Sequence, residues 1–332
     1  MTKLIAKYDG YYSLANLSAD SKRGVALTKK KYREHVVVFD TAKGSIVAEQ
    51  PLTHSPNIVS ISPDGKTVVF NDKQAVGGIP QDPEFAFFLI IWNIEKNTTQ
   101  KFPIEDIQNT YDDIAWITDT QFVILSFQYG SYWDVYMGET SVFRVASRFG
   151  GGHYLYYHQH LMIFEHDLDK TTIFYADGFT PPIEIPHRMC LMEKPSSRVY
   201  LPTRGIAIAP NNTLSAMVLD ERKSLGDDAN LFKKKIVIWD IAHNQHIHTL
   251  VGERELTALS WSPDSTRLLV SELNMGKKTS HVILWNTVTG QKEADFAKID
   301  GYVDNIIWSG GRVYISTQKV YVDPVLTVWE GK

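Results

Sequence analysis

The chain has 332 residues, of which 34 are Lys or Arg and 38 are Asp or Glu, so its formal net charge at pH 7 is −4. This charge gives no general attraction to nucleic acid or to an anionic membrane surface. The single cysteine, Cys190, excludes an intrachain disulfide and a multi-cysteine zinc site. The longest apolar run, Phe85–Trp92, is far shorter than the roughly 20 residues that span a bilayer. With no apolar secretory signal in its first residues, the chain is expected to be cytoplasmic and to have no membrane partner.

Short apolar runs bounded by Gly, Pro, Asn, Asp and Ser recur along the chain, and helical spacing of apolar residues is almost absent. Most residues in these runs are β-branched or aromatic, which suits a pleated, buried strand. The clearest runs are Val36–Phe39, Thr67–Phe70, Gln121–Leu125, Ile236–Trp239 and Val282–Trp285. The sequence therefore predicts an all-β chain.

A first repeated signature is an apolar strand that ends in a large residue and runs into a polar turn. After Ile61 the turn reads Ser-Pro-Asp-Gly, and after Trp261 it reads Ser-Pro-Asp-Ser. Pro sets φ at the second turn position, and Asp binds its own backbone, so these quartets favour tight hairpin turns. The strand-ending residues are Leu17, Ile61, Trp116, Ile208, Trp261 and Trp308.

A second signature follows some 20 to 30 residues later, as an apolar strand that ends in an aromatic residue and a short polar one. Its examples are Phe39-Asp40, Trp92-Asn93, Trp239-Asp240, Trp285-Asn286 and Trp329-Glu330. A turn and one more short strand come after it. Each unit thus has four strands, a to d, where the first signature ends strand a and the second ends strand c.

Successive first signatures lie about 44 to 55 residues apart, and one gap of about 92 holds two units. Four-stranded units of this length that close radially form a β-propeller. We therefore predict one seven-bladed β-propeller over residues 1–332. Its blades are expected at about 11–50, 55–103, 110–149, 152–186, 203–250, 255–297 and 302–330. A strand at 3–8 lies outside these units and is predicted to complete the last blade and close the ring.

The Ser-Pro-Asp-Gly turn and the Trp-Asp and Trp-Asn strand ends resemble the WD-repeat β-propeller family over the whole chain. The Gly-His element of that family is missing. Before Trp261 the chain reads Val-Gly-Glu-Arg, and His54 is closer to its turn than the family spacing requires. The resemblance implies a non-enzymatic scaffold that binds a protein or peptide and serves as a subunit of a larger complex, without a cofactor.

The connections between strands b and c are predicted to be long, irregular loops at one face, where loops on a rigid scaffold often carry function. Another long connection, Met189–Arg204, joins two blades at the same face. The alternative is that propellers tolerate insertions at little entropic cost. The predicted b–c loops are Thr28–His35, Asn71–Phe85, Phe127–Ser141, Asp220–Lys234 and Glu272–Ser280.

The richest of these loops contains four aromatic residues that we predict to anchor a partner: Tyr129, Tyr132, Trp133 and Tyr136. Trp133 is the one tryptophan outside the repeat signatures. The alternative is that this segment extends a strand and packs on the neighbouring blade. Arg222 and Phe232 are second choices, in a connection whose mixed charges also fit an ordinary solvated surface.

No catalytic motif is found: the chain has no phosphate-binding Gly-rich loop before a helix and no G-x-S-x-G nucleophile turn. The second hypothesis is a propeller enzyme or a small-ligand or metal-binding protein. Its site would lie at the mouth of the central channel, where the same polar residues also fit simple hydration of the entrance. The residues expected at this mouth are His54, Asp112, Arg204, Glu255 and Asp304.

Basic and histidine-rich stretches are expected to be surface features. Lys29–Lys31 with Arg33, and Lys233–Lys235, are short and lie near acidic residues, so no nucleic-acid partner is expected. His158 and His160 flank a predicted a–b turn, away from the long loops, and are interpreted as turn residues and not as metal ligands.

Overall fold

The fold was obtained as a computed structural model, in which the described residues form strands β1–β29 and contain no helix. No segment within the described part of the chain is therefore a helix long and apolar enough to cross a membrane. The description leaves out residues 1–2, 31–32, 55, 57, 80–81, 105–109, 117, 129–131, 138–139, 147–152, 159, 167–169, 176–180, 187–197, 201–205, 223–232, 319–323 and 332.

The contacts divide the chain into two compact units, and the first of them is Leu14–Gly150. It contains three antiparallel sheets of four strands, each in chain order, except that the first three residues of the first strand, Tyr11–Ser13, are assigned to the other unit. The strands are β2 (Tyr11–Leu17), β3 (Arg23–Lys30), β4 (Arg33–Asp40) and β5 (Ile46–Pro51); β6 (Val59–Ile61), β7 (Thr67–Ile79), β8 (Asp82–Asn93) and β9 (Thr98–Ile104); β10 (Thr110–Trp116), β11 (Phe122–Gln128), β12 (Tyr132–Met137) and β13 (Thr140–Ala146).

The second unit combines Met1–Ser13 with Gly151–Lys332 and holds four sheets. Its strands are β14 (His153–His158), β15 (His160–His166), β16 (Lys170–Tyr175) and β17 (Ile183–Pro186); β18 (Arg198–Tyr200), β19 (Ile206–Ile208), β20 (Leu214–Arg222), β21 (Lys233–Asp240) and β22 (Gln245–Val251); β23 (Glu255–Trp261), β24 (Arg267–Asn274), β25 (Thr279–Asn286) and β26 (Gln291–Asp300); β27 (Tyr302–Ser309), β28 (Arg312–Gln318), β29 (Val325–Glu330) and β1 (Leu4–Asp9).

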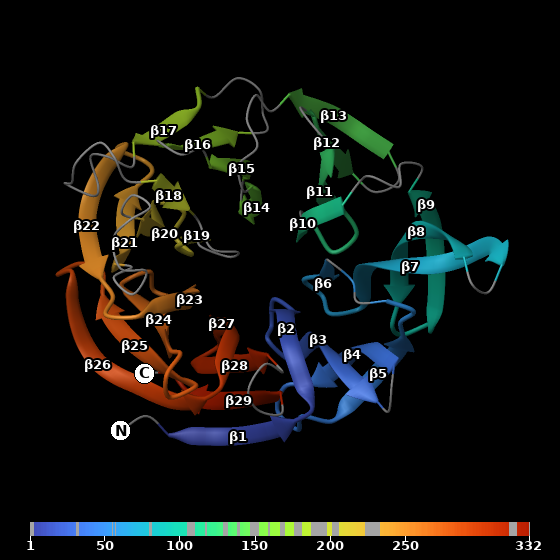
Figure 1. Cartoon of the computed structure of the whole chain (residues 1–332), viewed down its shortest axis with the longest axis horizontal. Helices are drawn as coiled ribbons and strands as arrows, with labels where there is room; N and C mark the ends of the chain where they lie inside the picture. Colours follow the sequence, from blue (N-terminus) through green and yellow to red (C-terminus); the bar gives the residue numbers. More distant parts are fainter. Residues whose placement is uncertain are drawn as a thin grey trace. The chain divides into compact units, whose positions relative to one another are not determined.

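The last of these sheets joins the two ends of the chain. Strand β1 pairs antiparallel with β29, with Leu4 opposite Trp329 and Asp9 opposite Val325 (Figure 1). The sheet order is β1-β29-β28-β27, so the N-terminal strand supplies the fourth strand that the last repeat lacks. This is the pairing predicted for the strand at 3–8.

Both sequence signatures mark strand ends as predicted. Strands β2, β6, β10, β19 and β23 end at the residues of the first signature, and β27 ends one residue beyond Trp308. The Asp, Asn and Glu residues of the second signature end β4, β8, β21, β25 and β29.

Hydrogen bonds within the first turn explain why its sequence recurs. The Ser62 hydroxyl donates to Asp64 Oδ1 over 2.7 Å and accepts from the Thr67 N–H over 2.9 Å. Gly65 adopts a left-handed φ of 72°, which costs glycine little. The turns that begin at Ser18 and Ser262 have the same Ser–Asp and Ser–backbone bonds.

The core lies between neighbouring sheets, because the b and c strands are buried while the d strands are largely exposed. One apolar cluster joins residues of β19–β22 to residues of β23 and β24. The indole N–H of Trp261 crosses this boundary and donates to the Ala207 carbonyl over 2.9 Å. In the first unit, the Trp116 indole donates to Ser60 Oγ over 3.0 Å. The tryptophans that end a strands therefore fix adjacent sheets to each other.

The prediction of long, irregular b–c loops is wrong where the connections are described. They are β-hairpins whose pairing extends to Lys30↔Arg33, Ile79↔Asp82 and Asn274↔Thr279. Pairing satisfies the backbone N–H and C=O groups that an irregular loop would expose. Glycines such as Gly77 and Gly78 obscured the strand pattern in the sequence.

Candidate functional site

The hairpins between strands b and c reach the same end of each antiparallel sheet as the connections that lead into the next strand a. We call this the hairpin end of a sheet. It is the end predicted to carry the binding surface.

The β7–β8 hairpin extends beyond the other strands of its sheet. Strand β6 pairs with β7 through Val59–Ile61, and β9 pairs with β8 as far as Phe87↔Ile104. Beyond these points the two strands pair with each other as far as Ile79↔Asp82. We call Gln74–Ile79 with Asp82–Ala86 the arm. Figure 1 shows β7 and β8 projecting outward past β9.

The arm presents groups that a folded chain usually covers. No described strand pairs with its two outer edges, and open edges are templates for strand addition. The register shifts between Ala75 and Gly77, so Val76 forms a bulge, and its side chain is 58% exposed. At the base, Lys73 Nζ lies 5.5 Å from the centre of the Phe87 ring, within range of a cation–π contact.

The base of the arm is held by a buried carboxylate. Asp72 is 2% exposed and accepts hydrogen bonds from the backbone N–H groups of Thr53 and His54, at 3.2 and 3.1 Å. Gln74 Nε2 donates to its second oxygen over 2.9 Å. His54 Nδ1 lies 2.7 Å from the Lys73 carbonyl, which can only accept, so this nitrogen carries the proton. The connection into β6 is thereby fixed to the arm.

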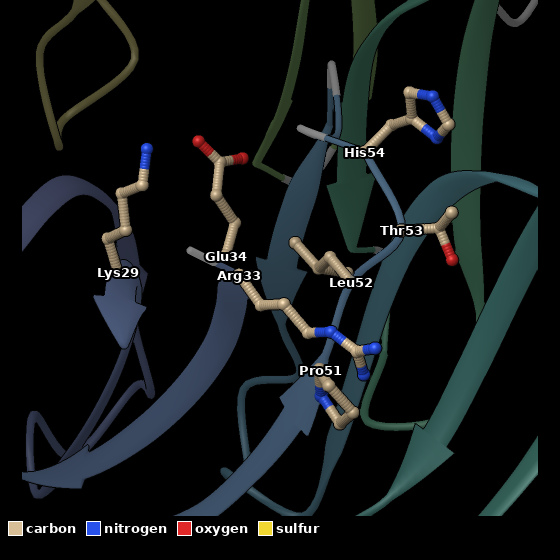
Figure 2. A pocket seen from close by; sticks show the side chains of 7 residues that line it. All are labelled: Lys29, Arg33, Glu34, Pro51, Leu52, Thr53 and His54. Atoms are coloured by element: carbon tan, nitrogen blue, oxygen red, sulfur yellow. The ribbon is translucent and has the colours of Figure 1, made fainter. Parts of the chain in front are cut away.

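A cavity of about 430 Å³ lies beside this connection. It is lined by Lys29 and by the residues Arg33, Glu34 and Pro51–His54. Figure 2 shows Lys29 and Glu34 extending in the same direction from the β3–β4 hairpin, while Arg33 reaches toward Pro51 and Thr53. The Leu52 N–H donates to the Glu34 carbonyl over 2.8 Å, so the two walls of the cavity are joined through the backbone.

The cations of this cavity differ from their neighbour Lys30. Lys30 forms an ion pair with Glu49. Lys29 and Arg33 are exposed, and no carboxylate of the described residues lies within ion-pair distance of either. Their charges are therefore available to a ligand.

The sheet β23–β26 has a similar carboxylate at the base of its hairpin. Glu272 is 2% exposed and accepts the Glu253 N–H over 3.2 Å. Burial raises the pKa of the Glu272 carboxyl, and the nearby charge of Glu253 raises it further. A Cβ at Gly252 would lie 3.0 Å from Leu256 and 3.1 Å from Glu272, so the carboxylate leaves little room at this position.

The predicted aromatic anchors are not in a loop where they are described. Tyr132, Trp133 and Tyr136 lie in β12, whose backbone pairs with both β11 and β13. Trp133 is thus in the third strand of its sheet and belongs to the repeat, contrary to our expectation. Tyr129 lies outside the described residues.

The remaining predicted residues are distributed over several elements. Asp112 and Asp304 occupy equivalent places, each at a register shift near the start of an a strand, and Asp304 is 8% exposed. Glu255 is the first residue of β23 and is exposed. His54 lines the cavity described above, and Arg222 ends β20 opposite Arg198. The predicted residues outside the described ranges are Arg204 and Phe232.

No group of three His, Cys, Asp or Glu side chains suited to a metal ion is found within the described ranges. The sequence did not identify Asp72, Val76, Lys29 or Arg33 as parts of a site. One signal was present for Asp72: an acid directly follows the buried run Val68–Asn71 of strand β7. The basic stretch was interpreted as balanced by nearby acids, but of its described cations Lys29, Lys30 and Arg33 only Lys30 forms an ion pair.

No family model and no curated protein sequence matches the chain. Two solved structures are similar in fold. A chain in the crystal structure of the Mitotic Checkpoint Complex has a TM-score of 0.64 at 15% identity, covering 99% of this chain and 92% of that one. The Cps50 (Swd1) β-propeller domain of Myceliophteria thermophila has a TM-score of 0.61 at 10% identity, covering 100% of both chains. These similarities support the resemblance to WD-repeat propellers and show that the chain has a β-propeller fold.

Proposed function

We propose that this chain is a non-enzymatic propeller scaffold that binds a protein partner at the hairpin end of its sheets. The observation that carries the proposal is the β7–β8 arm, whose outer edges pair with no other described strand and whose Val76 is exposed. Exposed apolar groups and open edges in a soluble protein are typical of surfaces that another chain covers.

The proposal includes one ring of seven blades, closed by β1 in the sheet of β27–β29, in a single cytoplasmic domain. The seven described sheets and the β1–β29 pairing support this arrangement. A closed ring leaves few sheet edges exposed, which makes the open edges of the arm more notable. The similarity to a chain of the Mitotic Checkpoint Complex is consistent with a subunit role.

The partner surface includes the hairpins predicted from the sequence. Tyr132, Trp133 and Tyr136, with Tyr129, are proposed contacts at the β11–β12 hairpin, where large aromatic side chains suit an interface anchor. Arg222 and Phe232 are proposed contacts at the β20–β21 connection. The arm is the primary contact in this proposal, because its residues Ala75–Gly78 are exposed.

Affinity purification of a tagged chain from its own cells, with quantitative mass spectrometry, tests the proposal. Two valines provide matched variants: Val76 on the arm is 58% exposed, and Val288 in a c–d turn, at the opposite end of its sheet, is 70% exposed. Val76→Asp is expected to weaken binding of a specific protein by about thirtyfold and to reduce its recovery accordingly, as for the loss of one interface hot spot of about 2 kcal/mol. Val288→Asp is expected to leave recovery unchanged. Equal recovery with both variants, confirmed with purified components, would refute the arm as the contact.

A further inference from the structure

The two outer edges of the arm differ in the backbone groups that they offer. In an antiparallel pair, alternate residues of a strand direct their N–H and C=O groups away from the partner strand. On β7 this outward series begins below the arm, where the Asn71 N–H donates to the Ile58 carbonyl over 3.4 Å. Two residues on, the Lys73 carbonyl accepts from His54 Nδ1 over 2.7 Å. The register is unbroken as far as Ala75, the next member, which therefore directs its N–H and C=O away from β8.

Beyond the bulge, Gly78 also keeps its backbone groups free of β8. It pairs with Pro83, which has no N–H, so the two residues cannot exchange hydrogen bonds. Ala75 and Gly78 are exposed, and no hydrogen bond joins either of them to a described residue outside β8. Their register partners, Phe85 and Pro83, are two residues apart on β8, which is the repeat of a regular strand. One added strand can therefore reach both residues.

The β8 edge of the arm is less suited to such an addition. Pro83 lies opposite Gly78 and has no N–H to donate, and proline on an edge strand opposes the addition of another strand. The β7 edge, Gln74–Ile79, contains neither proline nor a charged residue. Gly77 and Gly78 carry no side chain, so another backbone can approach closely there. A strand is therefore expected to add to β7 and not to β8.

We propose that the partner protein adds a basic, extended segment as a new β-strand along the β7 edge of the arm. The arm contains two acids, Asp82 and Glu84, and no Lys or Arg, so its charge favours a segment that contains Lys or Arg. The same charge disfavours a second copy of this chain, whose arm would be equally acidic. The proposal rests on the proposed function in taking the arm as the contact, and it adds the mode of binding and the character of the segment.

The free backbone groups and Val76 have different parts in this binding. Ala75 and Gly78 together supply two N–H donors and two C=O acceptors, and Val76 between them is 58% exposed. In strand addition, backbone hydrogen bonds supply the affinity, while side chains at alternate positions supply the specificity. A peptide of suitable charge is therefore expected to bind even when it is not the natural partner.

The test is fluorescence anisotropy of a short labelled peptide, Lys-Val-Thr-Val-Lys-Thr-Val-Lys, titrated with the purified chain. A second peptide has Glu in place of each Lys. A third has N-methyl groups on its two central residues, which remove one donor from each of its edges. We expect the Lys peptide to bind, and the Glu and N-methylated peptides to bind about tenfold more weakly or not at all, because charge attraction or a backbone hydrogen bond is lost.

Two variants at one position provide the matched control. Ala75→Pro removes the outward N–H but no hydrogen bond to β8, because that N–H faces away from β8. Ala75→Thr also changes the side chain and keeps the N–H. Ala75→Pro is expected to weaken binding of the Lys peptide about tenfold, and Ala75→Thr to leave it unchanged. The N-methylated peptide tests the same hydrogen bonds with the wild-type chain, so the conclusion does not depend on how the proline variant folds.

Several results would overturn the proposal. Strand addition is wrong if the wild-type chain binds none of the peptides, binds the N-methylated peptide as well as the Lys peptide, or is affected equally by Ala75→Pro and Ala75→Thr. Equal binding of the Glu and Lys peptides would refute the basic character of the segment. A dimer in analytical ultracentrifugation that Ala75→Pro dissociates would assign the edge to a second copy of this chain.

The titrations use no partner from cells, so the two proposals fail separately. Loss of the partner in the Val76→Asp purification, with no effect of N-methylation or of Ala75→Pro here, would keep the arm as the contact and remove strand addition. Peptide binding that depends on the Ala75 N–H, with unchanged recovery of the partner by Val76→Asp, would keep strand addition at this edge and remove the arm as the contact for that partner.

Discussion

The β7–β8 and β24–β25 hairpins occupy the same place in the repeat, yet they differ beyond their base. Both have a buried carboxylate, Asp72 or Glu272, that accepts backbone N–H groups of the connection into strand a. Strand β24 then ends at Asn274, and a turn over Met275–Lys278 closes the hairpin. Strand β7 instead continues to Ile79.

The comparison distinguishes the base of each hairpin, which stabilises the fold, from the tip, which is available for binding. In both hairpins the carboxylate satisfies backbone N–H groups of the connection into strand a. With the base secured in this way, the tip can be short or long without affecting the core. Both tips expose an apolar side chain, Val76 on the long hairpin and Met275 on the short one. Only the long hairpin of the two has strand edges that pair with no other described strand, and these edges are the basis of the proposed contact.

The largest expected loss of stability comes from substituting a tryptophan in the strand that leads out of a hairpin. Trp92 of β8 is 0% exposed, and its indole N–H lies 3.3 Å from Asn97 Oδ1. We expect Trp92→Ala to lower the free energy of unfolding by about 3–5 kcal/mol, as for other buried aromatic residues. Trp285 of β25 is only half-buried. Trp285→Ala is therefore expected to lower the free energy of unfolding by less. Urea denaturation of both variants measures the two losses, and a larger loss for Trp285→Ala would contradict this ranking.

The two carboxylates differ in the number of donors that they satisfy. Asp72→Ala leaves two backbone N–H groups without their acceptor, and the expected loss in the free energy of unfolding is about 3 kcal/mol. Glu272→Ala removes one such bond, so a loss of about 1 kcal/mol is expected. Urea denaturation measures both. Equal losses would contradict the role given to the number of N–H groups that each carboxylate accepts.

The ionisation of Glu272 makes the stability of the folded chain depend on pH. The pKa of Glu272 is higher in the folded chain than its ordinary value of 4.5. The protonated carboxyl therefore contributes its full stabilisation below pH 4.5, and this stabilisation is lost as the pH rises through the pKa of the folded chain. Glu272→Gln keeps an acceptor for the Glu253 N–H without the charge. It is expected to raise the melting temperature at pH 7 and to have little effect near pH 4. A variant less stable than wild type at pH 7 would contradict the role of burial.

The smallest effect on stability is expected from removing the arm itself. The long hairpin can be shortened by replacing Ala75–Phe85 with the four residues Met275–Lys278 of the short hairpin. The junctions match, because the flanking pair Gln74↔Ala86 corresponds to the pair Asn274↔Thr279 that flanks the short turn. The free energy of unfolding is expected to change by less than about 1 kcal/mol, because the change shortens an exposed connection. Calorimetry checks this, and a collapse of the melting transition would show that the arm is part of the core.

The repeat was predictable because its signals are local. The Ser-Pro-Asp turns and the aromatic strand ends occur within a few residues of each other, and the strands at Val36–Phe39 and Val282–Trp285 were identified with them. Even the pairing of the N-terminal strand with the last repeat followed from counting, because the last repeat had three strands and the N-terminal segment had no unit.

The hairpin end was less predictable because its properties depend on pairing between distant residues. Ala75 and Phe85 pair across an arm whose glycines read as loop. Trp133 has no repeat signature beside it, although β12 pairs on both sides. Whether Lys29 or Lys30 is neutralised depends on Glu49, which the fold brings to Lys30. Sequence spacing alone does not contain this information.

The central claim is that the chain binds its partner at the hairpin end, through the arm, while the bases of the hairpins maintain the fold. Hydrogen–deuterium exchange of the chain, alone and with the purified partner recovered through the Val76 comparison, tests it most directly. The account predicts slower exchange on binding at Gln74–Ile79 and Asp82–Ala86, because added strand pairing protects open edges, and no change at the c–d turns. Protection confined to the c–d turns, with the arm exchanging as in the free chain, would contradict it.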